Sequence, residues 1–97
     1  MKILAMEKEI AGSKPEQLAQ QLIFEAKQVW KLYQEGFIRE FYFRQDQSKA
    51  VLILECTNRE EALRVLDSLP LVQQGLIAFD LIPLIPYPGF SRLFVQN

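Results

Sequence analysis

The chain has 97 residues, 49% of them hydrophobic and 24% charged, with a formal net charge of −1 at pH 7. These values indicate one globular domain and exclude a disordered or fibrous chain. The basic residues are spread along the sequence without a cluster, which argues against a nucleic-acid partner.

The sequence opens with a predicted strand over residues 2–9, which is followed by a turn and a helix. Ser13 and Glu16 have the spacing of a capping box that starts this helix, with Pro15 in its first turn. Gly36 is predicted to end the helix, at a position where a left-handed backbone conformation costs glycine little.

Apolar residues recur at helical spacing through this predicted helix. They are Leu18, Leu22, Ala26, Val29 and Tyr33, with Ile23 and Trp30 widening the stripe on one side. Phe24 lies off the stripe, among polar residues. Two explanations fit it: a lone exposed aromatic, or a side chain covered by the C-terminal tail or a partner subunit.

A hairpin and a second helix are expected next. Residues 37–44 and 50–56 are rich in aromatic and apolar residues and flank a polar turn over residues 45–48, which predicts the hairpin. A capping box over residues 57–60 (Thr-Asn-Arg-Glu) predicts a short helix that Pro70 stops. Its inward-facing residues are expected to be Ala62, Leu63, Leu66 and Leu69.

A final strand is predicted over residues 76–85, where Pro83 indicates a sheet edge or a strand end. Residues 86–97 form an extended C-terminal tail, whose aromatic residues suggest that it docks on another surface. We therefore expect one α+β domain over residues 1–97 with the ferredoxin-like βαββαβ fold. In this fold, an antiparallel four-stranded sheet carries two helices on one face.

Both faces of the predicted sheet are apolar, although two helices can cover only one. Strict alternation places Phe37, Arg39, Phe41 and Phe43 on one face of the second strand, and Ile38, Glu40, Tyr42 and Arg44 on the other. Each large apolar side chain left in water forgoes roughly 1.5–3 kcal/mol of burial. We therefore expect a homodimer, or an assembly of dimers, that pairs through its sheets.

Cys56 is the one cysteine, so an intramolecular disulfide cannot form, which fits the reducing cytoplasm. It closes a strand on an apolar face and is expected to be a buried small hydrophobe. Charge at residues 7–9 comes too early for the core of a signal peptide, and no apolar run approaches the roughly 20 residues that span a bilayer. We expect a cytoplasmic protein with no membrane partner.

Three segments carry a resemblance to a known family: residues 30–44 (Trp-Lys-Leu-Tyr-Gln-Glu-Gly-Phe-Ile-Arg-Glu-Phe-Tyr-Phe-Arg), residues 69–72 (Leu-Pro-Leu-Val) and residues 82–84 (Ile-Pro-Leu). They resemble the muconolactone isomerase-like family of the dimeric α+β barrel group. The resemblance implies a ferredoxin-like protomer, pairing through the sheets, and a pocket in each subunit. The activity it implies is proton movement within an unsaturated lactone, without a metal or an organic cofactor.

The chain departs from this family in two respects. It has no histidine, including after Pro83 and Leu84, where the resemblance leads us to expect one, and its C-terminal tail is extended. Histidine is also the usual catalytic base and the commonest transition-metal ligand. The chain is therefore similar to an uncharacterised sister group of the isomerases.

Proton abstraction next to a carbonyl requires a base near the substrate and a donor for the enolate that forms. Glu40, Tyr42 and Arg44 share one strand face at i, i+2 and i+4. Glu40 would be the base, Tyr42 the hydrogen-bond donor, and Arg44 the anchor for a substrate carboxylate. Glu55 is expected on the same face, toward its far end.

A rival anchor, Arg39, is expected on the other face beside Trp30 and Tyr33. The structural alternative is a cross-strand ion pair of Glu40 with Arg44 at the dimer interface, with Tyr42 packed between the subunits. Asp46 is expected to be a turn residue that caps its own backbone. The sequence contains no catalytic triad, phosphate loop or set of residues at metal-ligand spacing.

Two functions follow from these observations. The first is a cofactor-independent isomerase, or a related proton-transfer enzyme, that acts on a small anionic or partly apolar molecule. The second is a non-catalytic protein of the same fold that binds a metabolite or only assembles.

Overall fold

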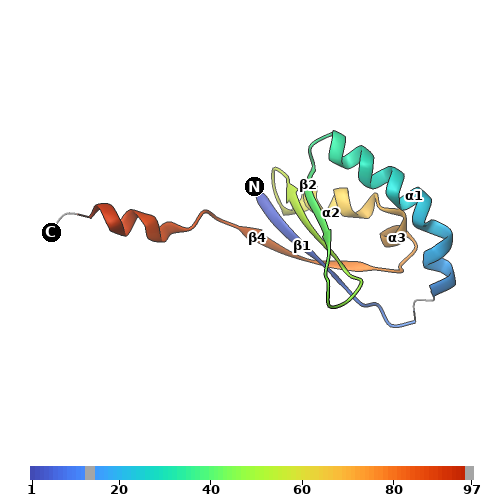
Figure 1. Ribbon diagram of the computed structural model, residues 1–97. Helices are drawn as coiled ribbons and strands as arrows, with labels where there is room; N and C mark the ends of the chain where they lie inside the picture. The colour runs from blue at the N-terminus through green and yellow to red at the C-terminus, as the bar shows by residue number, and fades with distance from the viewer. Residues whose placement is uncertain (13–14, 96–97) are drawn as a thin grey trace.

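The computed structural model describes residues 1–12 and 15–95, which form an α+β structure. Its elements are β1 (Lys2–Lys8), α1 (Pro15–Gln34), β2 (Ile38–Phe43), β3 (Ala50–Glu55), α2 (Arg59–Asp67), α3 (Pro70–Gln73), β4 (Ala78–Leu84) and the 3-10 helix η1 (Pro88–Phe94). The strands pair antiparallel in the order β2-β3-β1-β4. The α-helices lie on one face of this sheet (Figure 1). The antiparallel four-stranded sheet is therefore confirmed, and the arrangement is compatible with a ferredoxin-like fold.

The core lies between the sheet and the helices. Its largest fully buried side chains are Ile3, Ile38, Leu52, Leu54 and Leu69. Helix α2 adds Ala62, Val65 and Leu66, whereas Leu63 is exposed. The prediction that Leu63 faces inward is wrong because residues 62, 65, 66 and 69 already form one helical face at the i, i+3, i+4, i+7 spacing, and Leu63 lies beside it.

The apolar stripe of α1 and its buried face do not coincide. Leu32 is buried and Leu18, Glu25 and Val29 are partly buried. The exposed members of the apolar stripe form a surface that we call the α1 apolar face. It consists of Leu22, Ile23, Ala26, Trp30 and Tyr33. The helix is rotated by roughly a quarter turn relative to an orientation that would bury the whole stripe.

An extra residue in β2 changes which of its side chains share a face. The register with β3 shifts between Ile38 and Glu40, so Arg39 is the extra residue. A bulge of this kind breaks strict alternation. Ile38 therefore faces the core, whereas Glu40 pairs with Ile53 on the opposite face. The expectation that Ile38 and Glu40 share a face is wrong.

The cap of α2 lies one residue later than predicted. The Oδ1 atom of Asn58 accepts a hydrogen bond from the Glu61 amide at 2.9 Å, and the Oε1 atom of Glu61 accepts one from the Thr57 amide at 2.9 Å. Asn58 and Glu61 therefore form the capping interaction, in place of Thr57 and Glu60. Pro70 begins α3 rather than stopping α2, because proline fits the first turn of a helix.

Three local predictions concern glycine, proline and the start of α1. Gly36 follows α1 with a φ of 89°, as predicted for a left-handed helix end. Pro83 lies in β4, which is an edge strand, also as predicted. The predicted capping box of α1 includes residues 13 and 14, which lie outside the described residues.

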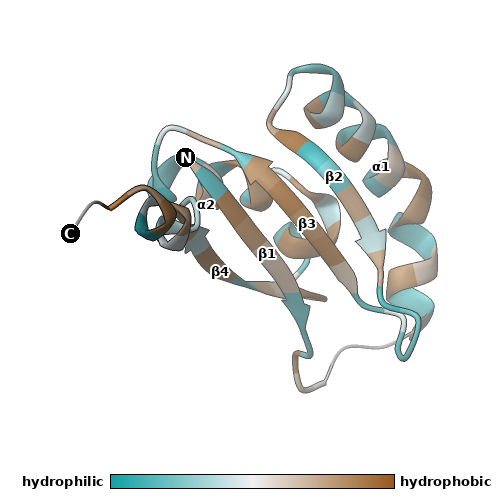
Figure 2. Ribbon diagram, turned by 60° about the vertical axis from the view of Figure 1, so that its left-hand side comes forward, coloured by the Kyte–Doolittle hydropathy of each residue, from teal (hydrophilic) through white to brown (hydrophobic). Residues whose placement is uncertain are grey.

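The sheet face away from the helices, which we call the outer face, is largely apolar. Leu4 of β1 pairs with Ile53 of β3 on one side and with Ile82 of β4 on the other, and Met6 pairs with Val51. Figure 2 looks onto this face and shows hydrophobic residues along β1 and β3. The second apolar face predicted from the sequence is therefore present, and none of the described helices covers it.

The C-terminal arm, residues 85–95, runs away from the rest of the chain (Figure 1). The molecule accordingly measures 63 Å along its longest principal axis, against 29 and 21 Å along the others. Ile85, Phe90, Leu93 and Phe94 of the arm are exposed. Phe24 is exposed as well, so within the chain the arm does not cover it.

Candidate functional site

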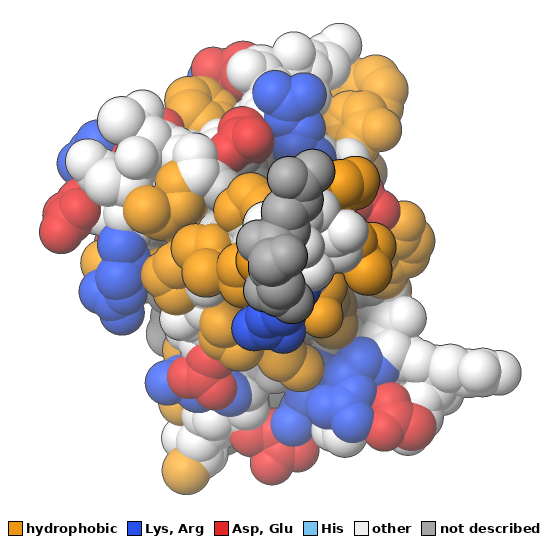
Figure 3. Space-filling view, turned by 90° about the vertical axis from the view of Figure 1, so that its left-hand side faces the viewer, with side chains coloured by type: hydrophobic (Ala, Val, Ile, Leu, Met, Phe, Trp, Pro, Cys, Tyr) orange, Lys and Arg blue, Asp and Glu red, His pale blue; other side chains and the backbone are white. Residues whose placement is uncertain are grey.

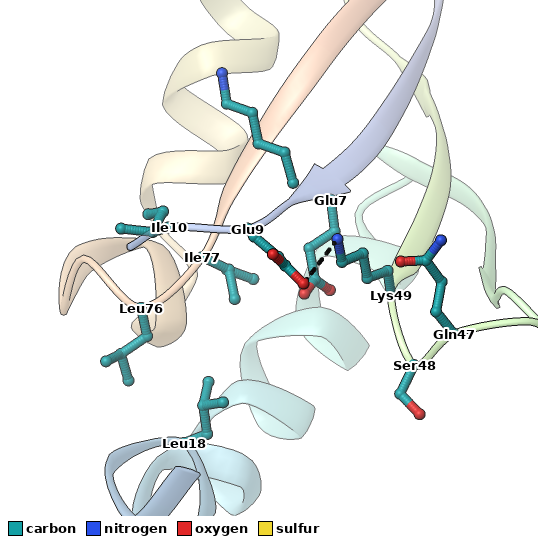
Figure 4. A pocket seen from close by; sticks show the side chains of 10 residues that line it. Glu7, Glu9, Ile10, Leu18, Gln47, Ser48, Lys49, Leu76 and Ile77 are labelled. Atoms are coloured by element: carbon teal, nitrogen blue, oxygen red, sulfur yellow. Dashed lines mark ion pairs between the residues drawn. The ribbon is translucent and has the colours of Figure 1, made fainter. Parts of the chain in front are cut away.

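A cavity of about 270 Å³ opens where β1 ends, beside the β2–β3 turn and the start of α1 (Figure 4). Its charged side chains include Glu7, Glu9 and Lys49, and its apolar wall is formed by Ile10, Leu18, Leu76 and Ile77. Small-molecule sites occupy about 300–1,000 Å³, are mostly apolar and carry a few polar groups. The cavity is slightly smaller and more polar than this range, with one charged side and one apolar side, and it has room for only a small ligand.

Glu7 is held in place by the backbone of β3. Its Oε1 atom accepts a hydrogen bond from the Ala50 amide at 2.9 Å. This bond extends the β1–β3 pairing by a side chain and directs the carboxylate toward Lys49 and Glu9, as Figure 4 shows. Glu7 is therefore a fixed carboxylate at the wall of the cavity.

Lys49 supplies a partly sheltered positive charge beside Glu7. Its Nζ atom lies 3.4 Å from the Oε1 atom of Glu9. The side chain of Lys49 is 21% exposed and that of Glu9 is 83% exposed. Because solvent-exposed ion pairs contribute little free energy, an anionic ligand can take the place of Glu9 at low cost.

Glu25 of α1 is partly buried where α1 meets α3. Burial raises the pKa of the Glu25 carboxyl above its ordinary value, and the negative charge of Glu7 adds to this effect. A hydrogen bond from the Leu71 amide, 3.0 Å from the Oε1 atom of Glu25, acts in the opposite direction. Glu25 is therefore a partly buried carboxyl group that is held by the backbone of α3.

The two residues predicted to be catalytic touch each other on the outer face of β2. The Tyr42 hydroxyl donates a hydrogen bond to the Oε1 atom of Glu40 at 2.7 Å. This bond raises the pKa of Tyr42, so the phenol keeps its proton. The pair has the contact that the sequence prediction requires, but it lies on an exposed surface and does not line the Glu7 cavity.

Arg44 is engaged within the β2–β3 turn. Its Nε and Nη2 atoms donate to the two carboxylate oxygens of Asp46 at 2.9 and 2.6 Å. The bond from Arg44 lowers the pKa of Asp46. Among the described residues, Arg44 pairs with Asp46 and forms no ion pair with Glu40, and the predicted pairing at a dimer interface stays a prediction. A substrate carboxylate at Arg44 would have to displace Asp46.

Glu55 and Arg39 lie at the opposite end of β3 and β2 from Arg44. The Oε2 atom of Glu55 lies 2.9 Å from the terminal nitrogen of Met1, and the hydrogen bond between them lowers the pKa of Glu55. The charge of Arg39 adds a smaller lowering of this pKa. Both residues lie at the end of their strands that is away from the β2–β3 turn.

Trp30 and Tyr33 stack on the α1 apolar face, with ring centroids 6.0 Å apart and an angle of 7° between the planes. Tyr33 also adds slightly to the raised pKa of Tyr42. The stack lies on the helix side of the sheet, whereas the Glu40–Tyr42 pair lies on the outer face. Of the predicted set, the structure pairs Glu40 with Tyr42 and stacks Trp30 on Tyr33 as two separate groups. Glu55 lies on the same sheet face as Glu40, as predicted, because Glu40 pairs with Ile53, two residues before Glu55.

The residues of the Glu7 cavity were not among the candidates from the sequence. Glu7 follows Ile3 and Ala5 at core-facing positions of β1, so strict alternation already places a carboxylate on the inner face. Glu25 likewise lies on the core-facing side of α1. The acidic residue at a core-facing position was therefore the feature of the sequence that could have identified Glu7. No feature of the sequence around Lys49 predicts its ion pair with Glu9.

Cys56 is buried, as predicted, and burial raises the pKa of its thiol. Within residues 1–12 and 15–95, no cluster of three Cys, Asp or Glu side chains is suited to hold a metal ion. No helix in the same part of the chain is both long and apolar enough to cross a membrane.

Comparisons with protein-family models and with curated proteins find no match to this chain.

Proposed function

We propose that the chain binds a small, anionic and partly apolar molecule in the Glu7 cavity and moves a proton on it without a cofactor. The observation that carries this proposal is the position of a fixed carboxylate, Glu7, beside a sheltered cation, Lys49, over an apolar wall. The resemblance to the muconolactone isomerase-like family supports the same class of reaction.

In the proposed reaction, the carboxylate of the ligand binds Lys49 in place of Glu9. The apolar body of the ligand packs on Leu18 and Ile77. The Glu7 carboxylate takes a proton from the carbon next to a carbonyl, and the C–H electron pair forms an enolate. Glu7 then returns the proton to another carbon of the conjugated system, so no oxidant or reductant is consumed.

Binding is tested by an NMR titration of the labelled protein with benzoate, and with benzyl alcohol as the uncharged control. Benzoate should shift the amide signals of cavity residues such as Leu18 and Lys49, and Lys49→Gln should abolish these shifts. Lys27→Gln, on an exposed part of α1, is the matched control and should behave as the wild type. Shifts that are equal for the two compounds, or unchanged in Lys49→Gln, would contradict the proposal.

Turnover is tested by exchange of substrate carbon-bound hydrogen in deuterated water, with an unsaturated lactone that carries a carboxylate. Glu7→Gln should abolish the exchange while the protein still folds, because glutamine keeps an acceptor for the Ala50 amide. Glu40→Gln should retain the exchange. The reverse result would move the chemistry to the Glu40–Tyr42 pair on the outer face.

A second candidate, a non-catalytic assembly protein, is favoured by the apolar outer face. Leu4, Ile53 and Ile82 form an apolar row across three strands of this face. Pairing of two such faces would produce the dimeric α+β barrel implied by the resemblance. If the chain self-associates but neither binds benzoate nor exchanges lactone hydrogen, assembly is its function.

A further inference from the structure

The C-terminal arm carries large apolar side chains that are exposed to solvent. Phe90 is 65% exposed, Leu93 76% and Phe94 80%. In Figure 3, which faces the arm end-on, hydrophobic side chains gather at the centre of the view. Exposed apolar clusters of this kind mark interaction sites.

The arm is a preformed element. Tyr87 packs over Gly89, where any side chain would collide with the tyrosine ring. Its ring also meets that of Phe90 edge to face, with centroids 4.9 Å apart. The Ser91 hydroxyl closes the turn by donating to the Pro88 carbonyl at 2.9 Å. A segment ordered in this way loses little conformational entropy when it binds.

A complementary surface lies on the α1 apolar face. A hollow of about 220 Å³ is lined there by Ala26, Val29, Trp30 and Tyr33. The stacked rings of Trp30 and Tyr33 form one wall of it. A phenylalanine or leucine side chain fits this lining by size and polarity, and the arm presents both.

The position of the arm favours contact with another molecule over contact with its own helix. The arm leaves from β4, one edge of the sheet, whereas α1 contacts β2, the opposite edge. Pro86 and Pro88 restrict the connection, because each proline fixes its own φ and holds the preceding residue extended. Tyr87, between them, has an extended backbone at φ −62° and ψ 120°.

We propose that the arm of each chain docks on the α1 apolar face of a second copy of the chain. Each copy then supplies one arm and receives one, so both exposed apolar surfaces are covered by one interaction. The α1 face is separate from the outer face of the sheet, so arm exchange and sheet pairing can occur together. Arm exchange does not depend on the proposed small-molecule activity.

Trp30 is the single tryptophan of the chain and reports directly on this contact. In the wild type at micromolar concentration, we expect blue-shifted emission and weak quenching by iodide. The double variant F90D/F94D should shift the emission to the red, increase quenching several-fold and lower the mass measured by light scattering. Phe24→Asp, on another side of α1, is the matched control and should leave all three readouts unchanged.

Contact between copies is separated from contact within one chain by mixing two variants. The acceptor is F90D/F94D, which keeps Trp30, and the donor is A26R/W30F, which has an intact arm and no tryptophan. Adding the donor should restore protection of the acceptor's Trp30 from iodide. The proposal is overturned if the donor has no effect, or if Trp30 is quenched equally in the wild type and in F90D/F94D.

Discussion

Glu25 and Leu71 connect the middle of α1 to the first turn of α3 through a hydrogen bond of 3.0 Å between the Glu25 Oε1 atom and the Leu71 amide. A second polar contact lies one turn further along α1, where the Gln28 Nε2 atom donates to the Ser68 Oγ atom at 2.9 Å. Both contacts lie on the side of α1 that faces the core. Both contacts are compatible with the observed orientation of this helix, in which much of the apolar stripe turns outward.

The protonation of Glu25 should make stability depend on pH. Burial raises its pKa in the folded state above the ordinary value of 4.5, so the folded state binds this proton more tightly than the unfolded state. The stabilising effect is complete at low pH and is lost as the pH rises through the raised pKa. Glu25→Gln removes this dependence and keeps an acceptor for Leu71.

Urea unfolding of the wild type and of Glu25→Gln, across acid to neutral pH, measures this effect. The variant should gain free energy of unfolding relative to the wild type as the pH rises. Glu35→Gln, at the exposed end of α1, is the matched control and should show no such gain. A wild-type advantage that grows with pH would contradict the assignment.

The burial pattern of α2 predicts different costs for two neighbouring leucines. Leu66 is buried at 3% exposure, so Leu66→Ala should lower the free energy of unfolding by about 2–5 kcal/mol. Leu63 is exposed, and Leu63→Ala should cost less than about 1 kcal/mol. Chemical denaturation checks both values, and equal costs would show that the face of α2 is assigned wrongly.

The cap of α2 predicts that Asn58 matters more than Thr57. Asn58→Ala removes the acceptor for the Glu61 amide and should cost about 1 kcal/mol of stability. Thr57 contributes its backbone amide to the cap, which Thr57→Ala retains, so this variant should be nearly neutral. If thermal unfolding shows that Thr57→Ala loses more stability than Asn58→Ala, Thr57 is the capping residue, as first predicted from the sequence.

If two copies pair through their apolar outer faces, a single charge introduced on this face should prevent self-association. Ile82 lies on this face beside Leu4 and is 43% exposed, so Ile82→Asp should leave the fold intact. Sedimentation should show a lower mass for this variant than for the wild type, because a carboxylate would be buried without a partner. Lys31→Asp, on α1, is the control, and an equal loss of mass in both variants would point to a different interface.

Most of the fold was predictable because its signals are local. Alternation along residues 50–56 and helical spacing along residues 15–34 identify the elements, and Gly36 marks the end of α1. The orientation of α1 was not predictable in the same way. It involves tertiary contacts such as that of Glu25 with Leu71, which are 46 positions apart, and helical spacing contains no information about such a pair.

The candidate site was predictable only in part. The contact of Glu40 with Tyr42 follows from their i, i+2 spacing on one strand face. The bulge at Arg39 and the pairing of Arg44 with Asp46 depend on backbone geometry in and beside β2, which the residue types alone do not specify. The Glu7 cavity requires that the end of β1, the β2–β3 turn and the start of α1 meet, which only the tertiary structure shows.

Self-association and the binding of a small anionic molecule are the two properties that we propose for this chain. Native mass spectrometry of the protein, purified gently from the cells that produce it, measures both properties at once. We predict an even number of chains with a defined extra mass for each chain, and loss of that mass in Lys49→Gln. A single chain that carries no added mass would contradict both the assembly and the proposed site.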